Sequence, residues 1–74
     1  MIVELILREQ PKLEPKGYEK IEFQNGVIFS SPVEGRVEVI IKRHPDGRIS
    51  VFTDKSEIIK SLCESSEVID IHAK

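Results

Sequence analysis

This sequence has few of the residues that commonly cross-link small domains through disulfides or bound metal ions. Cys63 is its one cysteine, which excludes a disulfide within the chain, and no Cys/His spacing resembles a zinc site. Tryptophan is absent, and aromatic residues make up 5% of the 74 residues. A chain of this length allows one domain, residues 1–74, which buries only about 60% of its unfolded surface. Oligomerisation is then the remaining common way to add stability.

Long hydrophobic runs are also missing. The apolar start of the chain is interrupted by Glu4 and ended by Arg8, without a basic leader segment or a small-residue cleavage motif. No stretch approaches the roughly 20 apolar residues that span a bilayer. Hydrophobic residues make up 39% and charged residues 32%, a composition typical of globular domains. We therefore expect a soluble, cytoplasmic domain without a membrane partner.

The motifs that usually carry catalysis or cofactor binding do not occur: there is no Gly-rich phosphate loop, nucleophile elbow or C-x-x-C. Asp70 and His72 share one face of a predicted strand, but two ligands do not make a metal site. His44, Asp46 and Arg48 cluster at a predicted hairpin tip, where turn chemistry explains Asp46 and exposure to water disfavours acid–base catalysis. We expect no enzyme, no cofactor, no metal and no small-molecule substrate.

Alternating apolar and polar residues predict six short β-strands. The first carries apolar residues on both faces, which is typical of a strand inside a sheet, and the last is expected beside it. Residues 9–19, with two prolines and a glycine, predict an irregular loop that crosses one end of the sheet. The predicted strands are 1–8, 20–24, 27–30, 36–43, 48–53 and 67–72.

Two tight turns are predicted between neighbouring strands. The pair Asn25-Gly26 indicates a type I′ hairpin, in a register that sets Phe23 opposite Ile28. The segment 44–47 (HPDG) predicts a type I turn that ends in a glycine with positive φ, Gly47. The second turn sets Ile41 opposite Val51 and Ile40 opposite Phe52.

One helix is predicted over residues 55–65. Asp54 is expected to cap it, with Glu57 at the third helical position as in a capping box. Its apolar stripe must dock on the sheet, because an isolated helix of this length is marginal. Cys63 is expected to be buried and inert in that stripe, which comprises Ile58, Ile59, Leu62 and Cys63.

The predicted fold class is α+β: a small, mostly antiparallel sheet of about five to six strands with one helix on one face. The element order is strand, hairpin, hairpin, helix, strand. One helix covers one face, so apolar residues on the other face are left without cover. Exposed apolar patches of this kind mark interfaces. The residues predicted to lack cover are Val27, Phe29, Ile40 and Phe52.

These residues favour a small non-catalytic interaction domain that binds protein through a sheet edge or an apolar sheet face. The partner is another protein or a second copy, and a homodimer is the default for self-association. The alternative is a nucleic-acid-binding protein that uses a basic hairpin, residues 36–48. The net charge of −2 and the few aromatic residues weigh against that alternative. The basic residues are Arg36, Lys42, Arg43 and Arg48.

Overall fold

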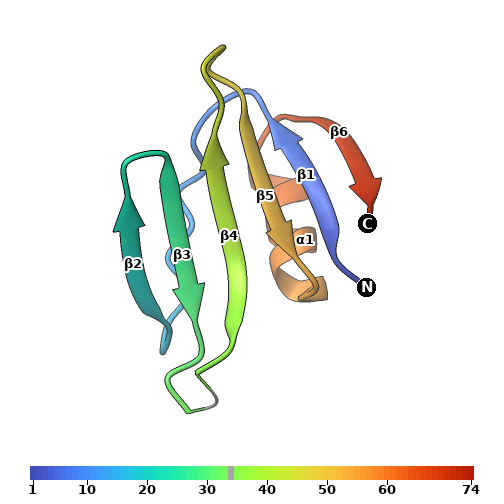
Figure 1. The fold of residues 1–74 in the computed structure, drawn as a ribbon. Coiled ribbons are helices and arrows are strands. Elements are labelled where there is room, and N and C mark those ends of the chain that lie inside the picture. Colours follow the sequence, from blue (N-terminus) through green and yellow to red (C-terminus); the bar gives the residue numbers. More distant parts are fainter. Residues whose placement is uncertain (34) are drawn as a thin grey trace.

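All six predicted strands form, and they belong to one sheet. The computed structural model describes residues 1–33 and 35–74, and within those residues it contains six strands and one helix. The sheet order is β2-β3-β4-β5-β1-β6, with every neighbouring pair antiparallel, and the helix lies on one face (Figure 1). This confirms the predicted α+β class. The elements are β1 (Val3–Leu7), β2 (Glu19–Phe23), β3 (Gly26–Ser30), β4 (Val37–Arg43), β5 (Ile49–Thr53), α1 (Ser56–Ser65) and β6 (Val68–Ala73).

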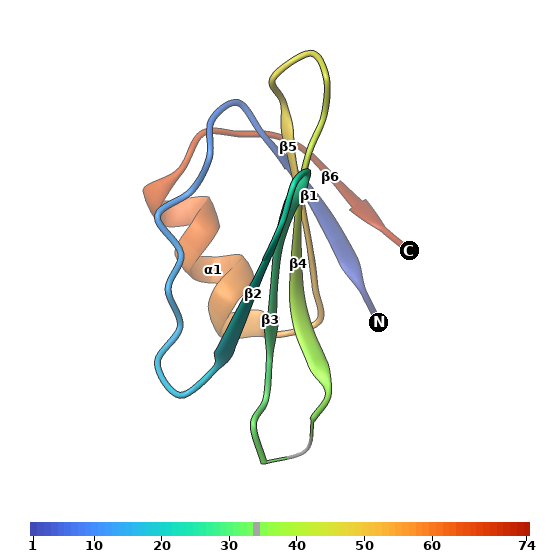
Figure 2. The ribbon, with the colours of Figure 1, turned by 60° about the vertical axis from the view of Figure 1, so that its left-hand side comes forward.

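β1 lies inside the sheet, between β5 and β6, as its apolar residues on both faces predict. β5 and β6 both run antiparallel to β1, so they are parallel to each other. Parallel strands need a long crossover, and α1 supplies it. The helix therefore lies across one face of the sheet, with β1 inserted between the two strands that it connects (Figure 2). In the described part of the chain, this ten-residue helix is too short to cross a membrane.

The hydrophobic core lies between this face and two covering segments. One is α1, which buries Ile58 and Leu62. The other is the loop of residues 8–18, which runs on the helix side of the sheet (Figure 2). Leu13 and Tyr18 in that loop pack against the core, and Pro11 is buried. The sheet contributes Leu5, Leu7, Val27, Phe29, Val39, Ile41, Ile49 and Val51.

The prediction that Val27 and Phe29 lack cover is wrong. They are 8% and 3% exposed and belong to the core. The reason is the loop of residues 8–18, which extends the cover provided by the short helix instead of only crossing the end of the sheet. The uncovered side chains of this hairpin are those on its other face, Ile21 and Phe23.

The predicted turn between β2 and β3 is displaced by one residue. Phe23 pairs with Gly26, so the loop is Gln24-Asn25 and neither Asn25 nor Gly26 has positive φ. Gly26 is required for a different reason: a Cβ built there would lie 2.0 Å from the Ile41 carbonyl oxygen of β4. Because the turn is displaced by one residue, each residue of β2 pairs with a β3 residue two positions from the predicted one. Residues two apart share a face, so every side chain stays on its predicted face.

The turn between β4 and β5 forms as predicted. Gly47 has φ +93°, and its N–H donates to the His44 carbonyl oxygen at 3.0 Å. The predicted pairs of Ile41 with Val51 and Ile40 with Phe52 are both present. A Pro-Asp-Gly turn therefore sets this register locally, because its backbone angles are specified by the residues themselves.

The two ends of the helix differ from the prediction in one respect each. Asp54 is not the cap: Lys55 occupies that position, and Thr53 Oγ1 accepts a hydrogen bond from the Lys55 N–H at 3.1 Å. Near the C-terminus, Cys63 is exposed, so its predicted burial is wrong. Ile58 and Leu62 are buried and Ile59 packs partly against the core, whereas Cys63, one position after Leu62, faces water.

We expect Gly26→Ala to destabilise the protein by roughly 1–3 kcal/mol, because the methyl group would force β3 away from β4. Gly47→Ala is the matched control. Its Cβ would meet no atom within 4 Å, so it carries only the strain of positive φ, about 1 kcal/mol. Urea unfolding of both variants measures the difference. A smaller loss at Gly26 than at Gly47 would show that the close approach does not limit the fold.

We expect the Cys63 thiol of the native protein to react with a thiol reagent such as Ellman's reagent without unfolding, because the side chain is exposed. The rate should match that of the same protein in denaturant within about tenfold. Protection by several orders of magnitude, with labelling only on unfolding, would place Cys63 back in the core.

Candidate interaction surface

The face of the sheet opposite α1 carries a continuous apolar row. Cross-strand pairing places Ile21 beside Ile28, Ile28 beside Ile40, and Ile40 beside Phe52, one residue from each of four adjacent strands. Paired residues point to the same face, so these four side chains line up across the sheet. Phe23 lies on the same face of β2, two residues from Ile21. We call these five residues the open-face patch.

The open-face patch is accessible to solvent. Phe23 is 55% exposed, Ile21 47% and Ile40 40%, while Ile28 and Phe52 are half-buried. Within residues 1–33 and 35–74, α1 and the loop of residues 8–18 both lie on the other side of the sheet (Figure 2). A shallow hollow of about 210 Å³ lies beside Phe23, and Gly26, Ile28 and Ile40 also line it. An apolar group of a partner could enter this hollow.

The predicted interface residues therefore divide between the two faces. Ile40 and Phe52 belong to the open-face patch, whereas Val27 and Phe29 belong to the core. Ile21 and Phe23 are the surface residues that the sequence reasoning missed. The alternation pattern put them on the face opposite Val27 and Phe29, but it did not show which of the two faces the helix and loop cover.

The same open face also carries a polar cluster, which includes Ser50 of β5 and Glu4 of β1. Ser50 is fully buried, and its hydroxyl donates to Glu4 Oε2 at 2.8 Å. Because this uses its one proton, Ser50 Oγ accepts from His44 Nε2, which lies 2.7 Å away. Lys74 Nζ lies 3.0 Å from Glu4 Oε1. The hydrogen bonds from Lys74 and then Ser50 lower the pKa of Glu4 below its ordinary value.

This polar cluster does not have the arrangement of a nucleophilic site. A serine nucleophile gives its proton to the histidine, whereas Ser50 gives its proton to Glu4 and has no exposed surface. Next to the cluster, His72 Nε2 and Asp70 Oδ2 are 3.1 Å apart, so the predicted pair on one strand face does meet. Among the described residues, no group of three or more His, Cys, Asp or Glu side chains could hold a metal ion.

Three of the four basic residues of the hairpin contact groups within the chain. Arg36 Nε lies 3.1 Å from Glu38, and Arg48 Nη2 lies 2.8 Å from Asp46. Arg43 donates to the carbonyl oxygen of Gln24 at 2.8 Å, beside the β2–β3 turn. Lys42 pairs with Gly26 and Ser50 on the open face. Lys42 and Arg43 are consecutive residues of β4 and point to opposite faces of the sheet, so the four basic residues are divided between the two faces.

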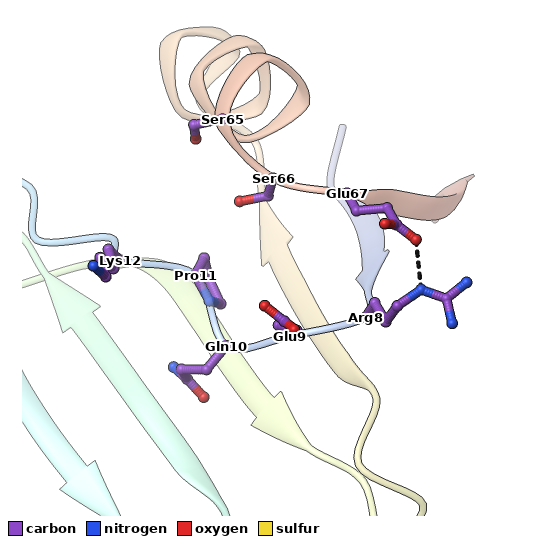
Figure 3. A pocket seen from close by; sticks show the side chains of 8 residues that line it. All are labelled: Arg8, Glu9, Gln10, Pro11, Lys12, Ser65, Ser66 and Glu67. Atoms are coloured by element: carbon purple, nitrogen blue, oxygen red, sulfur yellow. Dashed lines mark hydrogen bonds and ion pairs between the residues drawn. The ribbon is translucent and has the colours of Figure 1, made fainter.

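A larger hollow, of about 480 Å³, lies between the loop after β1 and the end of α1 (Figure 3). Arg8 and Glu67 form an ion pair at its rim, and both side chains are mostly exposed. Glu9 and Lys12 complete a lining with two positive and two negative charges. Such a balanced, solvated lining does not select a ligand of either charge.

The described residues define a class of protein: a two-layer α+β domain whose antiparallel sheet has one covered and one open face. No family model, curated protein or solved structure matches the chain. Its functional interpretation therefore depends on the surface itself, and we take the open-face patch, an exposed apolar surface that extends over four strands, as the candidate interaction surface.

We expect Glu4→Gln to lower stability by about 1 kcal/mol at pH 7, because it removes the charge from a carboxylate that Lys74 and Ser50 stabilise. The folded pKa of Glu4 is lowered, so this stability is present above the unfolded value, about 4.3, and is lost as pH falls through the folded pKa. Urea unfolding between pH 7 and pH 3 measures the difference in free energy of unfolding between this variant and the unmutated protein.

The control for this prediction is Glu64→Gln, on the exposed side of α1. The free energy of unfolding of this variant should differ little from that of the unmutated protein at every pH tested. If the Glu4→Gln difference stays constant down to pH 3, the polar cluster does not depend on the Glu4 charge.

Proposed function

We propose that this protein is a small, non-catalytic interaction domain that binds protein through the open-face patch, where that patch reaches the edge strand β2. The observation that carries the proposal is the exposure of Phe23 and Ile21 on an edge strand, at the end of a row of apolar side chains that extends over four strands. Contact of these apolar side chains with water does not stabilise the domain. Exposed apolar patches of this kind mark interfaces.

Burial energetics support the same surface. Complete burial of a Phe or Ile side chain contributes about 1.5–3 kcal/mol, and roughly half of the Phe23 and Ile21 surfaces remains accessible for further burial. Phe23 also borders the hollow above Gly26, and an aromatic side chain beside a small pocket is a common anchor in interfaces.

The partner that we propose is a second copy of this chain. Most soluble homo-oligomers are two-fold dimers, in which one patch contacts its own copy, so a self-complementary surface is sufficient. A small domain without a disulfide also gains stability from such association. Nucleic-acid binding through the residue 36–48 hairpin remains the weaker proposal, since Lys42 and Arg43 point to opposite faces and Arg36, Arg43 and Arg48 already contact groups within the chain.

We expect the protein to be a dimer at high micromolar concentration and Phe23→Asp to make it monomeric, because a charge would replace the anchor. Light scattering coupled to gel filtration measures the mass. Phe29→Asp is unsuitable for this test, because Phe29 lies in the core and its replacement would unfold the domain.

The matched control is Ile71→Asp. Ile71 is 50% exposed on β6, at the opposite edge of the sheet, and its replacement should leave the dimer intact. A monomeric unmutated protein, or dissociation by Ile71→Asp instead of Phe23→Asp, would contradict the proposal.

A further inference from the structure

The strand β2 has the properties of an edge that accepts another strand. In the described part of the chain it pairs only with β3, and all five of its residues are exposed. Its pairing with β3 is regular from Glu19 to Phe23, without a bulge. A regular edge strand presents a row of backbone N–H and C=O groups for pairing with another chain.

The other edge of the sheet is less suitable. β6 carries a register shift between Ile6 and Leu7 of β1, which leaves Ile69 as an extra residue. Bulges twist an edge away from regular pairing and are a common protection against it. At the end of β6, Lys74 is held by Glu4. Of the two edges, β2 is therefore the one open to a partner strand.

The sequence of β2 is complementary to itself when two copies run antiparallel. If Ile21 lies opposite Ile21 of the second copy, Lys20 lies opposite Glu22, and Glu22 opposite Lys20. Opposite residues in antiparallel strands have Cβ atoms about 4.5–5.5 Å apart, so both pairs have opposite charges within reach. A shift by one residue in either direction would set Lys20 opposite Ile21, or Ile21 opposite Glu22, and lose both pairs.

We propose that two copies of this chain join their β2 strands antiparallel about Ile21 and form one continuous sheet with two-fold symmetry. This inference rests on the proposed function and adds the geometry and the specificity of the contact. Lys20 and Glu22 lie on the helix side of the sheet, since they pair with Phe29 and Val27. Ile21 lies on the open face, opposite its own copy.

The apolar row continues through this contact. In one copy the row runs from Phe52 through Ile40 and Ile28 to Ile21, and the second copy repeats it in reverse. Phe23 lies diagonally opposite Ile21 of the second copy, a distance that an aromatic side chain can span. The joint sheet thereby buries part of the two most exposed apolar residues on β2, Ile21 and Phe23.

The ion pairs that Lys20 makes within one copy do not prevent this contact. Lys20 Nζ lies 3.3 Å from Glu14 Oε1 and 3.3 Å from Glu22 Oε1. Both carboxylates are well exposed, and exposed ion pairs of this kind are weak. Lys20 can therefore exchange a carboxylate of its own copy for Glu22 of the second copy at little cost in free energy. The backbone pairing between the two β2 strands then fixes the register.

The test is a pair of charge reversals in the full chain, measured by sedimentation velocity at low salt. Lys20→Glu places a new glutamate opposite Glu22 of the other copy, and Glu22→Lys places a new lysine opposite Lys20. Each variant alone should dimerise roughly tenfold more weakly than the unmutated protein, since two ion pairs become repulsive. An equimolar mixture should recover a heterodimer, because the glutamates of one variant then meet the lysines of the other.

A second measurement uses cross-linking. In a Cys63→Ser background, Ile21→Cys should form a covalent dimer on mild oxidation, because opposite Cα atoms in antiparallel strands are about 4.5–5.5 Å apart, within disulfide range. Ile71→Cys in the same background is the control and should stay monomeric. Preferential cross-linking at Ile71→Cys would overturn the proposal.

The outcomes separate this inference from the proposed function. If both charge reversals leave the dimer unchanged while Phe23→Asp dissociates it, edge pairing is wrong and the interaction domain stands. Dissociation by Ile40→Asp would then indicate that the two open faces pack on each other. Weakening by both reversals without recovery on mixing also overturns edge pairing. Association into large open assemblies would indicate contact between β2 and β6 instead.

Discussion

The structure depends on one constraint: a ten-residue helix has to cover a six-stranded sheet, and it reaches only part of one face. Two helical residues, Ile58 and Leu62, are buried, too few to cover the strands on that side. The loop of residues 8–18 supplies the rest through Leu13 and Tyr18. The chain has no further segment for the other face in its described part, and that face is consequently open.

The open face divides into two chemically different halves. At one end lie Ser50 of β5 and Glu4 of β1, which are buried or nearly so, and their polar atoms are matched by His44 and Lys74. Such a network is stable in contact with water. The row of positions that contains Glu4 holds Ile21 on β2, Ile28 on β3, Ile40 on β4 and Phe52 on β5, and these side chains gain nothing from water. This contrast along one row is the physical basis for placing an interaction surface on the apolar half.

The edges of the sheet differ as strongly as its faces. β6 is interrupted by a bulge opposite β1, whereas β2 is regular and, among the residues that the structure describes, pairs with one neighbour. Open edges are ordinarily blunted by such irregularities or by charge. In β2, Lys20 lies between Glu19 and Glu22, so its charges oppose pairing with an arbitrary strand while matching an antiparallel copy of itself. A single arrangement of charges can thus protect an edge and specify one partner.

The sequence alone determined the local features: six strands, one helix, the positive φ of Gly47, and the register of Ile41 with Val51. It also determined which residues share a face, because alternation is a property of each strand. It did not determine which face is covered, so Val27 and Phe29 were expected in water and Ile21 and Phe23 were missed. That choice belongs to the tertiary structure, since cover comes from segments distant in the sequence. Gly26 shows the same limit. A glycine is needed there because the Ile41 carbonyl of another strand lies too close for a side chain, and the local sequence does not show that contact.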